Sequence, residues 1–158
     1  MKIVKATKED IGRIMCIYKN AREFMVSQGN EQWPRGYPEK SRIEKELSSM
    51  YLCLHENQIA CVFYFAVEED EDYGEINGQW LNNQSYGVVH RIASTGIIKG
   101  AAQYCLDWCY QQYPNIRIDT YKDNIPMLKL LDKCGFHYCG TFERIGKTWF
   151  AYQKASGH

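Results

Sequence analysis

The sequence lacks an excess of charge of either sign. Its 19 lysine and arginine residues balance 19 aspartates and glutamates, so the formal net charge is zero and the pI is about 6.9. Proteins that bind nucleic acids or membrane surfaces through charge usually carry a basic surplus. We therefore expect neither a nucleic-acid partner nor a membrane-surface partner.

Long apolar runs are also missing. No stretch is long enough to cross a bilayer, and the first ten residues, MKIVKATKED, do not contain the apolar segment of a secretory signal. These absences predict a cytoplasmic protein with no membrane partner.

Paired cysteine motifs are absent, although cysteine itself is not. The chain has seven cysteines, an odd number, and no C-x-x-C pair. Cys105 and Cys109 lie one helical turn apart, which is half of a metal site, but no second pair has a suitable spacing. We expect buried, reduced thiols and no bound metal. The nucleotide-binding patterns G-x-x-x-x-G-K-[ST] and G-x-G-x-x-G are missing as well.

What the sequence does contain is enough apolar material for one core. Of its 158 residues, 45% are hydrophobic and 14% are aromatic, which predicts a single globular domain over residues 1–158. Hydrophobic periodicity predicts an α/β chain in the order β-α-α-β-β-β-α-β-α-β-β. The crossover in the second half implies a parallel strand pair and the hairpins imply antiparallel ones, so the sheet should be mixed.

The predicted elements have clear local signals. Thr7 is expected to cap the first helix together with Asp10, and that helix should bury a stripe from Ile11 to Phe24 and Met25. The elements are strand 2–6, a helix ending near Gly29, helix 39–50, hairpin 51–69, strand 86–94, helix 101–112, strand 116–121, helix 125–134 and hairpin 137–154.

The stretch STGIIKGAAQYCLDWC, residues 94–109, places small residues at the start of a helix. The N–H groups of a first helical turn have no intrahelical partner and attract anions. Gly100, Ala101 and Ala102 would let a phosphate reach these donors, with Lys99 adding positive charge and Gly96 loosening the turn. Tight packing of the helix against a strand would favour the same small residues, so both interpretations stay open here.

The order of elements and this stretch together resemble the GNAT superfamily of acyl-CoA N-acyltransferases along almost the whole chain. The resemblance implies a mixed, mostly antiparallel sheet that splays between its fourth and fifth strands and is flanked by helices. The family's Q/R-x-x-G-x-G/A loop, which wraps the diphosphate of coenzyme A, maps to residues 97–102, with Ile97 in place of the usual Gln or Arg. The resemblance thus implies acetyl-CoA as co-substrate and no metal.

Two further segments carry the resemblance. Asp123-Asn124 begins the helix that ends at Gly135-Phe136, as in the family, which implies that Asn124 contacts the pantetheine arm; a plain helix cap is the alternative. The family's splayed strand maps to residues 90–94. Its backbone at Ile92, Ala93 and Ser94 is therefore implied to pair with the pantetheine amides, as an added strand would.

The catalytic groups are less clearly marked. Many family members use a tyrosine as the acid for the leaving thiolate, but the matching residue here is Leu131. Tyr138 is a candidate substitute, although strand tyrosines are more often part of the core. His90, Glu75, Glu31 and Asp119 are candidates for the base, with a structural imidazole as the alternative for His90. Asp119 lies in an apolar run, and an ion pair with Arg117, Arg91 or His90 is expected there.

Aromatic residues in the polar loops indicate an acceptor pocket. Trp33 and Trp80 are expected to be its walls, with Glu31 or Glu75 attracting an ammonium group, unless these rings merely cover the sheet. The sequence thus predicts N-acetyl transfer to a small-molecule or amino-acid-like amine by direct attack. An acyl-CoA sensor, a protein amine as acceptor and a nucleotide-binding α/β protein are the alternatives, and a homodimer stays open.

Overall fold

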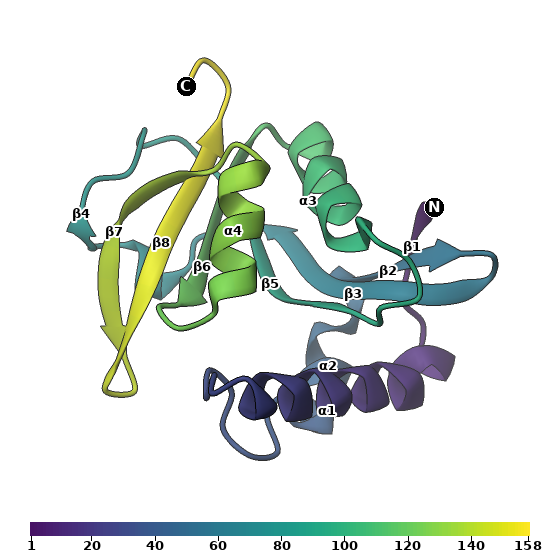
Figure 1. Ribbon diagram of the computed structural model, residues 1–158. Coiled ribbons are helices and arrows are strands. Elements are labelled where there is room, and N and C mark those ends of the chain that lie inside the picture. The colour runs from purple at the N-terminus through teal and green to yellow at the C-terminus, as the bar shows by residue number, and fades with distance from the viewer. The chain divides into compact units, whose positions relative to one another are not determined.

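The computed structural model describes all residues from Met1 to His158. Eight strands form an open, mixed sheet in the order β1-β2-β3-β5-β6-β8-β7-β4, and helices flank it (Figure 1). The α/β class and the mixed sheet are therefore as predicted. The strands are β1 (Lys2–Lys5), β2 (Met50–His55), β3 (Gln58–Val67), β4 (Asn77–Gly78), β5 (Gly87–Ser94), β6 (Asn115–Tyr121), β7 (His137–Arg144) and β8 (Lys147–Ala155). The helices are α1 (Ile11–Ser27), α2 (Lys40–Glu46), α3 (Ala101–Gln112) and α4 (Ile125–Lys133).

The chain divides into two compact units. Unit 1 comprises residues 1–65 and 91–105, and unit 2 comprises residues 66–90 and 106–158, so β5 and α3 each contribute to both. The expectation of a single domain stays a prediction. None of the helices is both long enough and apolar enough to pass through a lipid bilayer.

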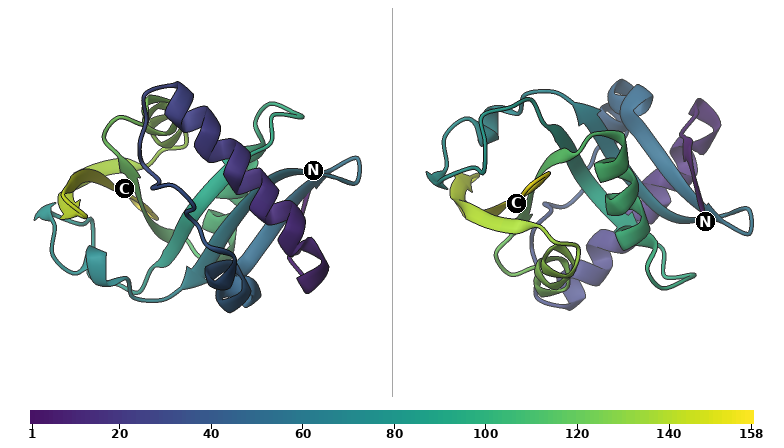
Figure 2. Two further views of the ribbon diagram at one scale, coloured as in Figure 1. Left: turned by 90° about the horizontal axis from the view of Figure 1, so that it is seen from below. Right: turned by 90° about the horizontal axis from the view of Figure 1, so that it is seen from above.

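Unit 1 is built on the antiparallel meander β1-β2-β3. Its hairpin turns at Glu56 and Asn57, whose φ angles of 51° and 64° match the right-handed twist of the flanking strands. Helices α1 and α2 lie on one side of these strands (Figure 1), and α1 runs across them in the view from below (Figure 2). Ile14, Ile43 and Met50 are fully buried in the resulting core.

Unit 2 contains the antiparallel ladder β6-β8-β7, with α4 against one face of these strands (Figure 1). The parallel pairing of β5 with β6 joins Gly87 to Ile116 and Val88 to Arg117, at the beginnings of both strands. The two-residue strand β4 pairs with β7 and was not predicted. It follows from a close approach of two backbones at Gly78 and Gly140, where a Cβ on Gly78 would lie 2.1 Å from the Cys139 carbonyl oxygen.

Two local predictions are wrong. The helix expected over residues 39–50 ends at Glu46 and tightens into a 3-10 turn, because the serines that follow are weak helix formers and Met50 is already paired in β2. Phe24 is not part of the buried stripe and is 62% exposed. It follows Tyr18 by six residues, about 240° around the helix, and therefore faces away from the core.

The thiols are mostly as predicted. All seven cysteines are free, and six of them are buried, whereas Cys16 on α1 is exposed. The structure contains no group of three or more His, Cys, Asp or Glu side chains that is arranged to hold a metal ion.

Candidate functional site

The turn before α3 is open and built on glycine. Gly96 and Gly100 have φ angles of +87° and +83°, and a Cβ built on either would meet nothing within 4 Å. The Tyr104 N–H donates to the Gly100 carbonyl at 2.9 Å, so the N–H groups of Ala101, Ala102 and the next residue precede the first helical bond. Lys99 is exposed beside them. The open space at both glycines and the unpaired N–H groups of the first helical turn fit a diphosphate.

The end of β5 leads directly into this turn. Ala93 is 5% exposed, Ile92 is half-buried and Ser94 is exposed. The strand end is fixed to β3 within unit 1, because Thr95 donates from its N–H to the Ala60 carbonyl at 3.0 Å and from its hydroxyl to Ile59 at 2.8 Å. The predicted pantetheine strand and the predicted diphosphate turn are therefore one continuous segment.

Asn124 is the N-cap of α4. Its Oδ1 accepts a hydrogen bond from the Met127 N–H at 3.3 Å, and the side chain is half-buried. The capping role that the sequence left open is confirmed. Its contact with a pantetheine arm stays a prediction.

A buried cluster surrounds Arg91 in unit 1. Its guanidinium forms an ion pair with Glu46 of α2 and donates to the Tyr37 hydroxyl at 3.3 Å, and its side chain is 6% exposed. The Tyr18 hydroxyl, from α1, donates to the Arg91 carbonyl at 2.9 Å. Trp33 packs edge-on against Tyr18 and Tyr37, with ring centroids 5.6 and 5.9 Å apart. We call Tyr18, Tyr37 and Glu46 around Arg91 the Arg91 clamp.

The predicted acceptor residues of unit 1 differ in exposure. Trp33 is 6% exposed, so its ring is mainly a core contact of the Arg91 clamp. Glu31, two residues earlier, is exposed. A role for either side chain in binding an acceptor stays a prediction.

Tyr73 is the centre of a second cluster, in unit 2. Its hydroxyl donates to Asp119 Oδ2 at 2.6 Å, and its ring lies 5.4 Å from Trp80 and 6.3 Å from His90. The Trp80 indole N–H donates to the Tyr73 carbonyl at 2.8 Å. Burial, reinforced by the Asp119 carboxylate, raises the pKa of Tyr73 well above its ordinary value, so the phenol stays neutral. Two predicted residues, His90 and Trp80, are therefore brought together around one buried ring.

The partner of Asp119 is not among the expected ones. Arg144, at the end of β7, binds Asp119 at 3.1 Å and Asp72 at 2.9 Å. Arg117 instead lies between the rings of Trp80 and Tyr86, with its guanidinium carbon 4.2 and 4.1 Å from their centroids. The expected ion pair exists, but Arg144 supplies the positive charge.

His90 has a carboxylate partner. Its Nε2 lies 3.0 Å from Asp70 Oδ2, and the side chain is 22% exposed. Burial would raise the pKa of Asp70, but hydrogen bonds from His90 and from the Asp72 N–H lower it below its ordinary value. When the ring is neutral, a hydrogen bond from Nε2–H to Asp70 leaves Nδ1 as the nitrogen that can accept a proton.

The other two proposed catalytic residues are Glu75 and Tyr138. Glu75 lines an acidic pocket of about 440 Å³ together with Glu71, Asp72, Asn77, Thr141, Phe142 and Glu143. Tyr138 is 56% exposed and packs against Phe150 and Tyr152 on the neighbouring strand. Leu131, where many GNAT proteins carry a tyrosine, is fully buried in the core.

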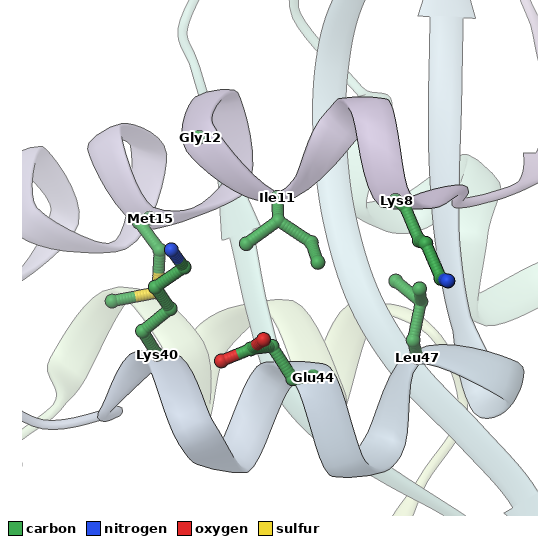
Figure 3. A pocket seen from close by; sticks show the side chains of 7 residues that line it. All are labelled: Lys8, Ile11, Gly12, Met15, Lys40, Glu44 and Leu47. Atoms are coloured by element: carbon green, nitrogen blue, oxygen red, sulfur yellow. The ribbon is translucent and has the colours of Figure 1, made fainter.

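Unit 1 has a pocket of its own between α1 and α2, of about 550 Å³ (Figure 3). The two helices run in opposite directions there, so that Lys8 lies opposite Leu47 and Met15 lies opposite Lys40. Ile11 lies between the two ends, with the Glu44 side chain opposite it. None of the predicted site residues lines this pocket.

Comparison with solved structures decides the family. An acetyltransferase of the GNAT family from Streptococcus agalactiae 2603 matches with a TM-score of 0.91 and 29% sequence identity, over 99% of this chain and 96% of that chain. The chain belongs to the GNAT superfamily. This GNAT fold is shared by a GNAT-family acetyltransferase from Listeria monocytogenes 4b F2365 (TM-score 0.72, 15% identity, 97% and 93% covered). It is shared also by the NatC complex bound to Gag peptide and CoA (0.63, 12%, 98% and 99%). No protein-family model and no curated protein matches the sequence.

Sequence reasoning about this GNAT chain missed three polar anchors. Asp70 lies in the acidic run EEDED, where the sequence does not distinguish one carboxylate from the next. Tyr18 lies on the buried stripe of α1 and is part of the core, but its hydroxyl also donates to the Arg91 carbonyl. Arg91 was considered only as a partner for Asp119. A tyrosine on a buried helix face needs a hydrogen-bond partner for its hydroxyl, so the sequence itself indicated a polar partner for Tyr18.

Proposed function

We propose that this protein transfers the acetyl group of acetyl-CoA to the amine of a small, positively charged acceptor by direct attack. The observation that carries the proposal is the open turn at residues 96–102, which follows β5 directly and presents the first N–H groups of α3. The solved structures support it, since two of them are named as acetyltransferases and the NatC complex is described as bound to CoA.

The cofactor-binding role is assigned to one continuous segment and one cap. The N–H groups of Ala101, Ala102 and the following residue would bind the diphosphate, with Lys99 adding charge at the edge of the turn. The backbone of Ile92, Ala93 and Ser94 would pair with the amides of the pantetheine arm. Asn124 is kept as a separate candidate for a contact with the pantetheine arm.

The amine must lose a proton before or as it attacks the thioester. His90 is the proposed base, because its dyad with Asp70 directs the lone pair of the neutral ring to Nδ1. The nitrogen attacks the acetyl carbonyl carbon, the C–S bond breaks, and the proton passes to His90. A thiol is far more acidic than an alcohol or an amine, so the thiolate can leave without a tyrosine at position 131.

The acceptor is inferred from charge. Glu71, Asp72, Glu75 and Glu143 line one pocket in unit 2, and only Asp72 has an arginine partner there. Such a lining favours an amine that carries a second cationic group. Glu75 would hold this second group, Trp80 is kept as a candidate wall of the acceptor site, and Tyr138 is kept as a candidate acid for the leaving thiolate.

The test is thiol release from acetyl-CoA with a panel of mono-, di- and polyamines, amino acids and N-terminal peptides. We expect release with di- or polyamines, and His90→Gln to lower kcat at least tenfold at pH 7. His137→Gln, a matched change at an exposed histidine of β7, should leave kcat unchanged. Binding of coenzyme A without thiol release from any amine would identify a sensor instead. Release only with peptides would move the acceptor to the protein class.

A further inference from the structure

Arg91 has a backbone conformation that its place in the sheet does not explain. Four non-glycine residues have positive φ angles, and Glu56, Asn57 and Ile145 lie in hairpin turns. Arg91, with φ +50°, lies inside β5, four residues after the strand begins. A left-handed residue in a strand is disfavoured and persists only where its surroundings hold it.

The Arg91 clamp supplies that hold from three separate segments. Tyr18 of α1 holds the carbonyl of Arg91, whereas Tyr37 of the following loop and Glu46 of α2 hold its guanidinium. Both ends of the residue are therefore fixed while the backbone between them turns. Trp33 packs against the two tyrosine rings and keeps them in place.

The left-handed residue changes the direction of the peptide groups that follow it. A residue with φ +50° does not continue regular strand geometry, so the backbone from Ile92 to Ser94 leaves Arg91 in a different direction from that of a regular strand. These are the residues proposed to pair with the pantetheine arm. The orientation of that strand thus depends on groups that do not touch the cofactor.

We infer that Arg91 is a positioning residue for coenzyme A, and that Tyr18, Tyr37 and Glu46 hold its left-handed backbone so that residues 92–94 are ready to bind the cofactor. This inference rests on the proposed function. It adds that cofactor affinity is set partly from α1 and α2, through hydrogen bonds to one arginine.

The test uses Tyr18→Phe, which removes the hydroxyl and keeps the ring against Trp33. Tyr104→Phe is the matched control, because it removes a hydroxyl that donates to another backbone carbonyl, that of Met1, at 2.8 Å. Amide hydrogen exchange at residues 91–94 is measured on the ligand-free protein, and the Kd for coenzyme A is measured by calorimetry. We expect Tyr18→Phe to speed exchange at these amides at least tenfold and to raise the Kd about tenfold, with neither change in Tyr104→Phe.

Two variants of Arg91 separate the effect of its positive φ angle from that of its side-chain contacts. Arg91→Gly adopts positive φ freely but loses the contacts with Glu46 and Tyr37, so it should also weaken coenzyme A binding about tenfold, whereas Arg91→Lys should recover part of the loss. Faster exchange with an unchanged Kd in Tyr18→Phe would overturn the inference and leave the proposed function intact. A wild-type protein that does not bind coenzyme A would overturn both.

Discussion

Replacing Gly100 by glutamate should abolish tight binding of coenzyme A. Gly100 has φ +83°, so any other L-residue pays roughly 1–2 kcal/mol of strain in the folded state. A Cβ would meet nothing within 4 Å, so the new side chain has room and points into open space at the turn. Gly100→Ala carries the same strain without the charge and is therefore the matched control.

The additional effect of glutamate is electrostatic. Two unit charges about 4 Å apart repel by about 1 kcal/mol in water and about 4 kcal/mol at an effective dielectric constant of 20. Taking about 2 kcal/mol for a carboxylate beside a diphosphate, Gly100→Glu should bind coenzyme A about 30-fold more weakly than Gly100→Ala. The difference between the Kd values of the two variants should decrease as salt is added, because the Debye length falls from about 10 Å at 0.1 M to about 3 Å at 1 M. Calorimetric titration at both salt concentrations measures this, and equal Kd values for the two variants would refute the diphosphate site.

Three further predictions concern the other clusters. The ionised form of Asp70 stabilises the fold because its pKa is lowered; that contribution is complete above the ordinary pKa near 4 and is lost as the pH falls through the lower folded value. Asp70→Asn should therefore lower the free energy of unfolding at pH 7 by about 1–2 kcal/mol. The free energy of unfolding should also decrease less between pH 7 and pH 3 in this variant than in the parent. Urea unfolding that shows the same decrease in both proteins would contradict this. Leu131→Tyr should destabilise the protein by about 1–3 kcal/mol through overpacking of a fully buried position and should not raise kcat; an unchanged Tm with faster thiol release would show that the position can accept an acid. Trp33→Ala should cost about 3 kcal/mol of stability because the ring is buried between Tyr18 and Tyr37, and a Tm within a degree of the parent would show that the ring is dispensable to the core.

Local patterns predicted most of the fold. Helix α3 begins and ends at the predicted residues, Ala101 and Gln112, because its small N-terminal residues and apolar periodicity act within a few turns of chain. Both long hairpins are also as predicted, since their turns have the positive φ angles that short hairpin loops require. The GNAT fold was identified from the same local segments together with their order.

Pairings between distant segments could not be predicted in the same way. Three residues were considered for Asp119, but the arginine that binds it lies 25 residues later, on β7, which joins β6 only through β8. The composition of the loop around Trp33 predicted a wall of the acceptor pocket, whereas the Trp33 ring is buried against Tyr18 of α1. Nothing in a single sequence marks Arg91 as left-handed, because its conformation is imposed by contacts from α1, α2 and the loop between them.

The loop that contains Trp33 and Tyr37 limits how the acceptor specificity of this protein can evolve. If this loop also borders the acceptor, then a mutation there that admits a new amine would loosen the strand assigned to acetyl-CoA at the same time. Adaptation to new amines should therefore be easier through Glu75 and Trp80, which take no part in holding Arg91. Drift among descendants would then concentrate in unit 2, while the Trp33 loop would change only together with Tyr18 or Glu46.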